Sequence, residues 1–65
     1  MTTTAFIVDN IWYEMDYAIV CKVRLAIGSD PTNRQILDYI RGHLIEYDMV
    51  GERSEDNLIV KVTER

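Results

Sequence analysis

Residues 29–51 carry the pattern that most constrains the fold, because their apolar side chains recur with the period of an α-helix. At about 100° per residue, five of them fall within one arc of roughly a hundred degrees. These are Ile36, Leu37, Ile40, Leu44 and Tyr47. Pro31 suits the first helical position, where a missing N–H costs nothing, and Gly51 suits a left-handed helix end. We therefore predict one long helix in this stretch, with one apolar face.

The start of this helix has two candidate caps, and the sequence leaves both open. Asp30 can act as the N-cap residue and accept a hydrogen bond from the first turn. Thr32 and Gln35 alternatively offer a capping box further along. On the opposite side, charged residues three and four positions apart can pair along the solvent face. They are Arg34, Asp38 and Arg41.

Three other segments have the composition or period of β-strands. Residues 5–13 are rich in β-branched and aromatic side chains, with Asp9 and Asn10 interrupting them as a bulge or a tight turn. Residues 17–27 alternate apolar and mixed positions with a period of two. Residues 58–63 give the last strand, with its alternate positions facing the core. The sequence therefore predicts two strands before the helix and one after it.

Residues 1–65 are expected to form a single small domain, since a chain of this length is near the lower limit for a self-supporting core. The predicted order is β-β-α-β. A hairpin, a right-handed crossover through the helix and a returning strand give a three-stranded antiparallel sheet of order 2-1-3. One helix on one face makes this an α+β two-layer sandwich. The other face of the sheet would have nothing in this chain to cover it.

A hairpin turn centred on Met15 decides which side chains reach that uncovered face, and a slip of one residue would invert every assignment. In this register the face carries two aromatic side chains, several aliphatic ones and three cations. The predicted partner-binding residues are Phe6, Val8, Trp12, Lys22, Arg24 and Lys61. Such a patch is typical of an interaction surface. Self-association, docking of a protein partner and stacking of single-stranded nucleic acid bases remain open as its use.

The charge of the chain weighs against nucleic acid. Eleven acidic and seven basic residues give a net charge of −4, whereas binding to a phosphate backbone needs excess Lys and Arg. A row of carboxylates along the predicted helix is a secondary acidic face that would instead imitate duplex phosphates. Its residues are Asp38, Glu46, Asp48 and Glu52. Mimicry of this kind is an alternative function, and a solvated helix face is the default reading.

Catalytic chemistry has little support in the sequence. His43 is expected to be a partly buried, hydrogen-bonded structural residue, because no nucleophile or orienting carboxylate accompanies it. Cys21 is expected to be an inert thiol on the inner face of a strand. No acidic or cysteine set has the spacing of a metal site. We therefore predict no enzyme activity, no metal and no cofactor.

One cysteine, no disulfide partner, no signal-peptide pattern and no apolar run of roughly twenty residues together predict a cytoplasmic chain that does not enter a membrane. The expected function is that of a small non-enzymatic interaction protein. It would bind and modulate a larger protein, most simply by inhibition, in the manner of a phage-encoded inhibitor or an antitoxin. The alternatives are a homodimeric domain that binds single-stranded nucleic acid through its open sheet and an acidic nucleic-acid mimic.

Overall fold

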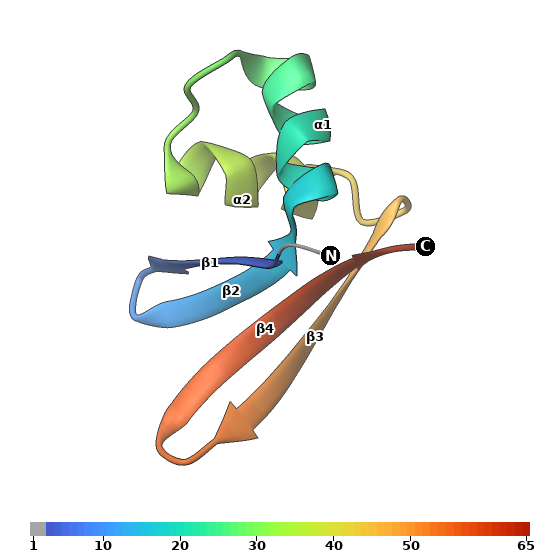
Figure 1. The fold of residues 1–65 in the computed structure, drawn as a ribbon. Helices are drawn as coiled ribbons and strands as arrows, with labels where there is room; N and C mark the ends of the chain where they lie inside the picture. The colour runs from blue at the N-terminus through green and yellow to red at the C-terminus, as the bar shows by residue number, and fades with distance from the viewer. Residues whose placement is uncertain (1–2) are drawn as a thin grey trace.

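The computed structural model describes residues 3–65, with the backbone alone at residue 54, and has an α+β fold of four strands and two helices (Figure 1). The elements are β1 (Thr3–Val8), β2 (Ile11–Asp16), α1 (Tyr17–Ile27), α2 (Asn33–Gly42), β3 (Tyr47–Ser54) and β4 (Asn57–Glu64). The general class is as predicted. The prediction of three strands and one helix is wrong, because two segments of the chain adopt the other type of structure.

The four strands form one sheet in the order β1-β2-β4-β3. The central pair, β2 and β4, is parallel, and the two outer pairs are antiparallel hairpins. This replaces the predicted antiparallel order 2-1-3. Both helices lie on one side of the sheet, and the β3–β4 hairpin extends away from them (Figure 1). The sheet therefore has an inner face toward the helices and an outer face that no other element of residues 3–65 covers.

The first hairpin turns at Asp9 and Asn10, not at Met15. Both turn residues have positive φ angles, of 52° and 65°, as a type I′ turn requires. This turn pairs β1 with β2 in a register that places Phe6 opposite Tyr13. Of the two sequence-based readings of the Asp9–Asn10 interruption, the tight turn is the one adopted.

Residues 17–27, predicted as a strand, form helix α1. Ile19, Val20 and Val23 are its buried residues, and they lie on one side of a helix as i, i+1 and i+4. Gly28 follows with a φ of 128° and donates its N–H to the carbonyl oxygen of Arg24 at 2.9 Å. An end of this kind is typical of a helix followed by glycine, since other residues adopt positive φ at a cost.

Helix α2 begins with the capping box and is shorter than predicted. The Thr32 hydroxyl accepts from the N–H of Gln35 at 3.2 Å, and the Gln35 amide oxygen accepts from the N–H of Thr32 at 2.8 Å. The alternative cap at Asp30 is not used. The helix ends at Gly42, a residue that costs about 1 kcal/mol in a helix interior. The chain then turns and forms strand β3, so Gly51 lies in a strand and ends no helix.

The core lies between the helices and the inner face of the sheet. All six elements contribute buried apolar residues to it. They are Phe6, Val8, Tyr13, Met15, Ile19, Val20, Val23, Ile36, Leu37, Ile40, Tyr47 and Val62. The predicted inward residues Ile36, Leu37 and Ile40 are confirmed. Leu44, predicted to be buried with them, lies in the turn after α2 and is 48% exposed.

Candidate interaction surface

The outer face of the sheet carries an exposed apolar row centred on Trp12. The strand register places Ile7 beside Trp12 and Trp12 beside Ile59, and the three side chains share the face that points away from the helices. Trp12 is 41% exposed, Ile7 is 45% exposed and Ile59 is half-buried. We call these three residues the Trp12 row. A tryptophan left this open at the middle of an apolar row is the most distinctive surface feature of the fold.

Charged groups surround the Trp12 row on the same face. Lys61 lies on β4 and pairs with Glu52 of β3, with 3.3 Å between the ammonium nitrogen and a carboxylate oxygen. Asp48 of β3 pairs with Arg65 at 2.6 Å. Acidic side chains are in the majority here, since Glu14 and Asp16 of β2 also fall on this face by strand alternation. The outer face is therefore apolar at one end and acidic toward the other.

Two of the predicted partner-binding residues belong to the core instead. Phe6 is 7% exposed and Val8 is 8% exposed, both on the inner face of β1. The ring of Phe6 stacks on that of Tyr13, with 5.8 Å between centroids and 24° between planes. The placement of Phe6 and Val8 on the open face is therefore wrong, whereas that of Trp12 and Lys61 is correct.

The other two predicted cations lie on α1 and not on the sheet. Lys22 forms an ion pair and hydrogen bond with Glu64, which raises the pKa of the Lys22 ammonium group. Arg24 donates to the hydroxyl of Tyr17 at 3.2 Å, and its guanidinium lies 5.8 Å from the centre of that ring. The open face thus has one of the three cations expected for it. A platform for nucleic acid loses most of its phosphate contacts.

The predicted acidic face is also dispersed. Asp38 is on α2, Glu46 is in the turn before β3, and Asp48 and Glu52 are on β3. The last two are already paired with cations. A single helix would have placed these carboxylates in one row, and that helix does not exist. The spacing that would imitate duplex phosphates is therefore missing from this set.

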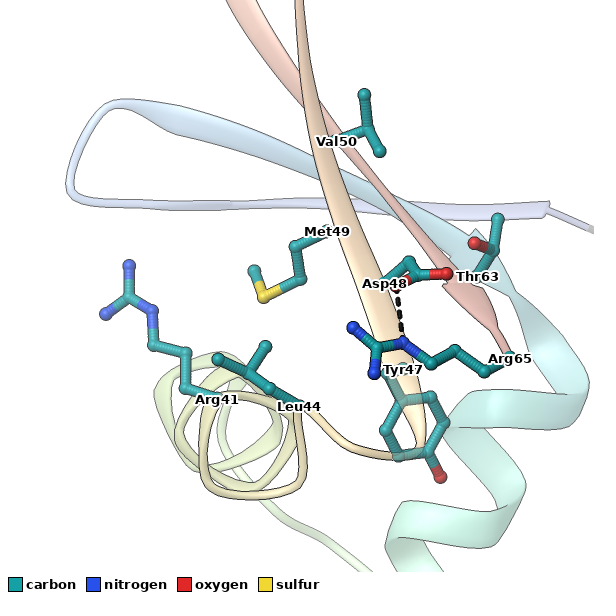
Figure 2. Close-up of a pocket in the computed structure, with 8 residues that line it drawn as sticks. All are labelled: Arg41, Leu44, Tyr47, Asp48, Met49, Val50, Thr63 and Arg65. Carbon is teal, nitrogen blue, oxygen red and sulfur yellow. Dashed lines mark hydrogen bonds and ion pairs between the residues drawn. The ribbon is translucent and has the colours of Figure 1, made fainter.

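A groove lies between the end of α2 and strand β3 (Figure 2). This groove has a volume of about 700 Å³. Its lining residues are Arg41, Leu44, Tyr47, Asp48, Met49, Val50, Thr63 and Arg65. The ion pair between Asp48 and Arg65 closes one side, and Leu44 and Met49 give the other an apolar wall. Its lining residues place no nucleophile beside a general base.

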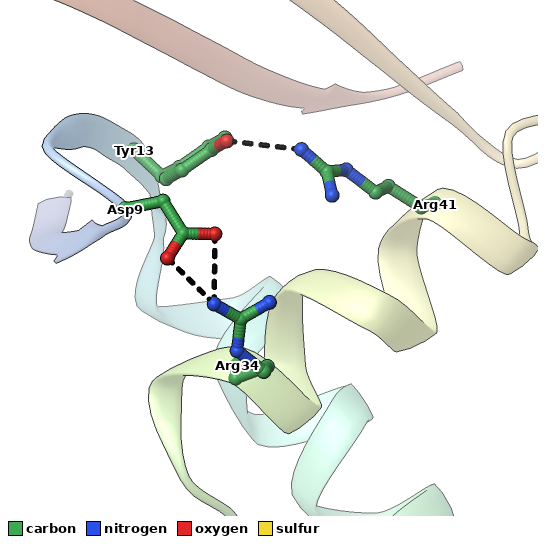
Figure 3. Close-up of polar contacts among 4 residues, drawn as sticks. All are labelled: Asp9, Tyr13, Arg34 and Arg41. Carbon is green, nitrogen blue, oxygen red and sulfur yellow. Dashed lines mark hydrogen bonds and ion pairs between the residues drawn. The ribbon is translucent and has the colours of Figure 1, made fainter.

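Two arginines of α2 hold the first hairpin in place (Figure 3). One guanidinium nitrogen of Arg34 donates to both carboxylate oxygens of Asp9 at 2.7 Å, and this raises the pKa of Arg34. Arg41 donates to the hydroxyl of Tyr13 at 3.2 Å. Both were expected to pair with Asp38 along the helix. They contact the sheet instead, because the β1–β2 hairpin passes beneath α2. The two arginines thereby hold the hairpin that carries Ile7 and Trp12.

The histidine and the cysteine have structural environments. His43 is half-buried, its ring stacks on Tyr39 at 4.0 Å, and its Nδ1 lies 2.8 Å from the carbonyl oxygen of that residue. The predictions that His43 is partly buried and hydrogen-bonded are confirmed. Cys21 was predicted to be buried in a strand, but it is half-exposed on α1. Across residues 3–65, no three potential ligands of the His, Cys, Asp or Glu type gather to hold a metal ion.

The fold and this surface define a small α+β domain with a sheet covered on one face. A scan against protein-family models, a search of curated proteins and a search of solved structures each found no match to the chain. Neither helix in the described part of the chain has the length and apolar character needed to cross a membrane.

Proposed function

We propose that this chain is a small non-enzymatic interaction protein that binds a larger protein through the outer face of its sheet and modulates it, with inhibition as the expected result. The observation that carries the proposal is the open Trp12 row. Tryptophan is enriched among residues that dominate binding energy, and such residues lie where a partner can exclude water from them. Trp12 has apolar neighbours on both sides in the same row, so a partner can bury a continuous surface there.

The surroundings of the row indicate the chemistry of the partner. The nearest cation, Lys61, is engaged by Glu52, and Glu14 lies beside Lys61 on the neighbouring strand. A partner surface with apolar side chains at its centre and Lys or Arg at its margin complements this arrangement. An acidic partner, or a phosphate backbone, would meet like charges.

The experiment uses the chain as an affinity bait in its native cell, followed by binding measurements with the purified captured protein. Trp12 is the only tryptophan of this chain, so its fluorescence reports the proposed contact once the signal of the captured protein alone is subtracted. We expect the captured protein to shield Trp12 from a soluble quencher. We also expect Trp12→Ala to lower the affinity at least about 30-fold, the factor that corresponds to a loss of roughly 2 kcal/mol at a dominant contact.

Leu25→Ala is the matched control. Leu25 is 88% exposed on α1 and lies on the helical layer, away from the outer face of the sheet. Its truncation should leave both affinity and quencher shielding unchanged. The proposal is overturned if Trp12→Ala binds the captured protein as tightly as the wild type, or if Leu25→Ala is the variant that loses binding.

A further inference from the structure

Strand β1 is an edge strand without any charged side chain. Its sequence is Thr-Thr-Ala-Phe-Ile-Val, and each of the other five elements contains at least one charged residue. It pairs with β2 along one side only, so the hydrogen-bonding groups of its other side have no strand partner within the described chain. Natural sheets protect such edges with charges, prolines or bulges, since a bare edge is a template for another strand.

The opposite edge of the sheet shows the usual protection. Strand β3 contains Asp48, Glu52 and Arg53, and Gly51 lies at its middle. Charged side chains and a residue of low β-propensity both oppose the addition of a further strand. The two edges of this sheet are thus unequal, and only β1 is suited to pairing.

We propose that β1 of one copy pairs antiparallel with β1 of a second copy, which joins the two sheets into one of eight strands. Charge limits the surfaces at which a second copy can bind. Each copy has a net charge of −4, so two copies repel unless they meet where neither presents acidic groups. Two elements, β1 and α1, contain no acidic residue, and of the two only β1 is an edge strand with a free row of backbone hydrogen-bonding groups in the described chain. Two outer faces packed together would instead bring Glu14 and Asp16 of both copies into contact.

The residues of β1 also suit antiparallel pairing with β1 of a second copy. A two-fold axis perpendicular to the sheet and passing near Phe6 places Ala5 of one copy opposite Ile7 of the second, and Thr4 opposite Val8 of the second. Residues that face each other then point to the same side, so both helical layers stay on one side and both outer faces on the other. Ile7, which is 45% exposed, gains an apolar neighbour across the new junction. The two Trp12 rows lie on one continuous outer face. This pairing stands independently of the proposed larger partner.

Two variants test which edge pairs, because one cross-strand row ends at Ala5 on β1 and at Val50 on β3. Glu14 and Lys61 lie between them, and all four residues share the outer face. Ala5→Lys and Val50→Lys therefore add the same charge to the same face at opposite edges. In sedimentation equilibrium we expect a dimer that dissociates on dilution for the wild type and for Val50→Lys. We expect a monomer for Ala5→Lys, with circular dichroism to confirm that each variant is folded.

Amide hydrogen exchange of the wild type provides a test that needs no substitution. The amides of β1 that point away from β2 should exchange more slowly as protein concentration rises, because dimerisation gives them acceptors. The amides along the free edge of β3 should exchange at a constant rate. A wild-type monomer at all concentrations would overturn the proposal. So would dissociation by Val50→Lys with Ala5→Lys still dimeric, or a dimer whose β1 exchange does not depend on concentration.

Discussion

Phe6 and Trp12 point to opposite faces of the same hairpin, although both are aromatic and only six positions separate them. The two-residue turn at Asp9 and Asn10 sets this relationship. It places Phe6 opposite Tyr13 on the inner face and Trp12 opposite Ile7 on the outer face. The hairpin therefore gives one aromatic ring to the core and one to the exposed surface. The core and the outer face thus receive different aromatic side chains.

This separation predicts different effects of two alanine substitutions. Phe6→Ala removes a buried ring that stacks on Tyr13, and we expect it to lower the free energy of unfolding by about 3–5 kcal/mol. Because a small domain has a total of about 5–15 kcal/mol, this loss is a large share of the free energy of unfolding and should shift the urea midpoint to a clearly lower concentration. Trp12→Ala removes a half-exposed side chain and should lower the free energy of unfolding by less than about 1.5 kcal/mol.

Urea unfolding followed by far-ultraviolet circular dichroism measures both variants, since this signal does not depend on Trp12. Tyr17→Ala is a further control, because Tyr17 is an aromatic residue of similar exposure on α1. Equal losses for Phe6→Ala and Trp12→Ala would contradict the assignment of the two rings to different faces.

The same turn explains why the sequence assigns some residues to the wrong face of the sheet. If residues 5–13 formed one strand, Phe6, Val8 and Trp12 would share a face, because side chains alternate with a period of two. A two-residue turn makes the strands pair so that even positions before it lie opposite odd positions after it. Trp12 and Lys61 are correctly assigned, whereas Phe6 and Val8 move to the core. The positive φ angles of the turn decide the register, and the Asp9–Asn10 pair alone does not distinguish a tight turn from a bulge.

Helix α1 was mistaken for a strand because its residues satisfy two periods at once. Only Lys22 and Arg24 are charged among its eleven residues, so an apolar stripe exists at spacing two and also at spacing three and four. Length favours the helix, since strands are usually shorter than eleven residues. Asp16 before it and Gly28 after it are the usual boundary residues. The buried face of α2 and strand β4 were predicted correctly because each has a single consistent pattern. The capping box was one of two caps that the sequence left open.

The second hairpin contains a strained turn residue. Glu55 has a φ of 55°, a left-handed conformation that a residue with a Cβ adopts at a cost of about 1–2 kcal/mol. Glu55→Gly removes this cost, and greater freedom of glycine in the unfolded chain offsets part of the gain. We expect a net increase of about 0.5–1 kcal/mol in the free energy of unfolding, measured by urea titration.

Asp56→Gly serves as the control for this turn. Asp56 is not among the described residues with positive φ, so glycine has no strain to relieve there and adds only unfolded-state entropy. Its free energy of unfolding should stay constant or fall. If both glycine variants gain stability equally, the conformation of Glu55 is not the cause.

The capping box of α2 gives a prediction about a single hydroxyl. Thr32→Ala leaves the N–H of Gln35 without its acceptor, and we expect a loss of about 1 kcal/mol in the free energy of unfolding. Thr32→Ser keeps the hydroxyl and should lose only a few tenths. Asp30→Ala tests the rejected cap and should change stability little. A larger loss for Asp30→Ala than for Thr32→Ala would show that the helix begins elsewhere.

Tyr47 gives the fold a predicted sensitivity to alkaline pH. Burial raises the pKa of the Tyr47 phenol above its ordinary value of about 10, and the nearby Tyr39, Glu46 and Glu64 add to the effect. In the unfolded chain the phenol loses its proton near pH 10, whereas in the folded chain it retains the proton to a higher pH. Between these two pKa values the unfolded state binds fewer protons, so the free energy of unfolding falls as pH rises. Below pH 10 both states are protonated and the group contributes no dependence on pH.

Urea titrations at about pH 8, 10 and 11 measure this effect, with pH values chosen around the ordinary tyrosine pKa. Tyr47→Phe keeps the buried ring and removes the titrating hydroxyl, so this variant should lose less stability than the wild type between pH 10 and 11. Tyr17→Phe changes a 44% exposed ring and leaves Tyr47 in place, so it should keep the wild-type loss. Identical losses for the wild type and Tyr47→Phe would contradict this prediction. They would mean that the phenol of Tyr47, at the start of β3, reaches water in the folded state.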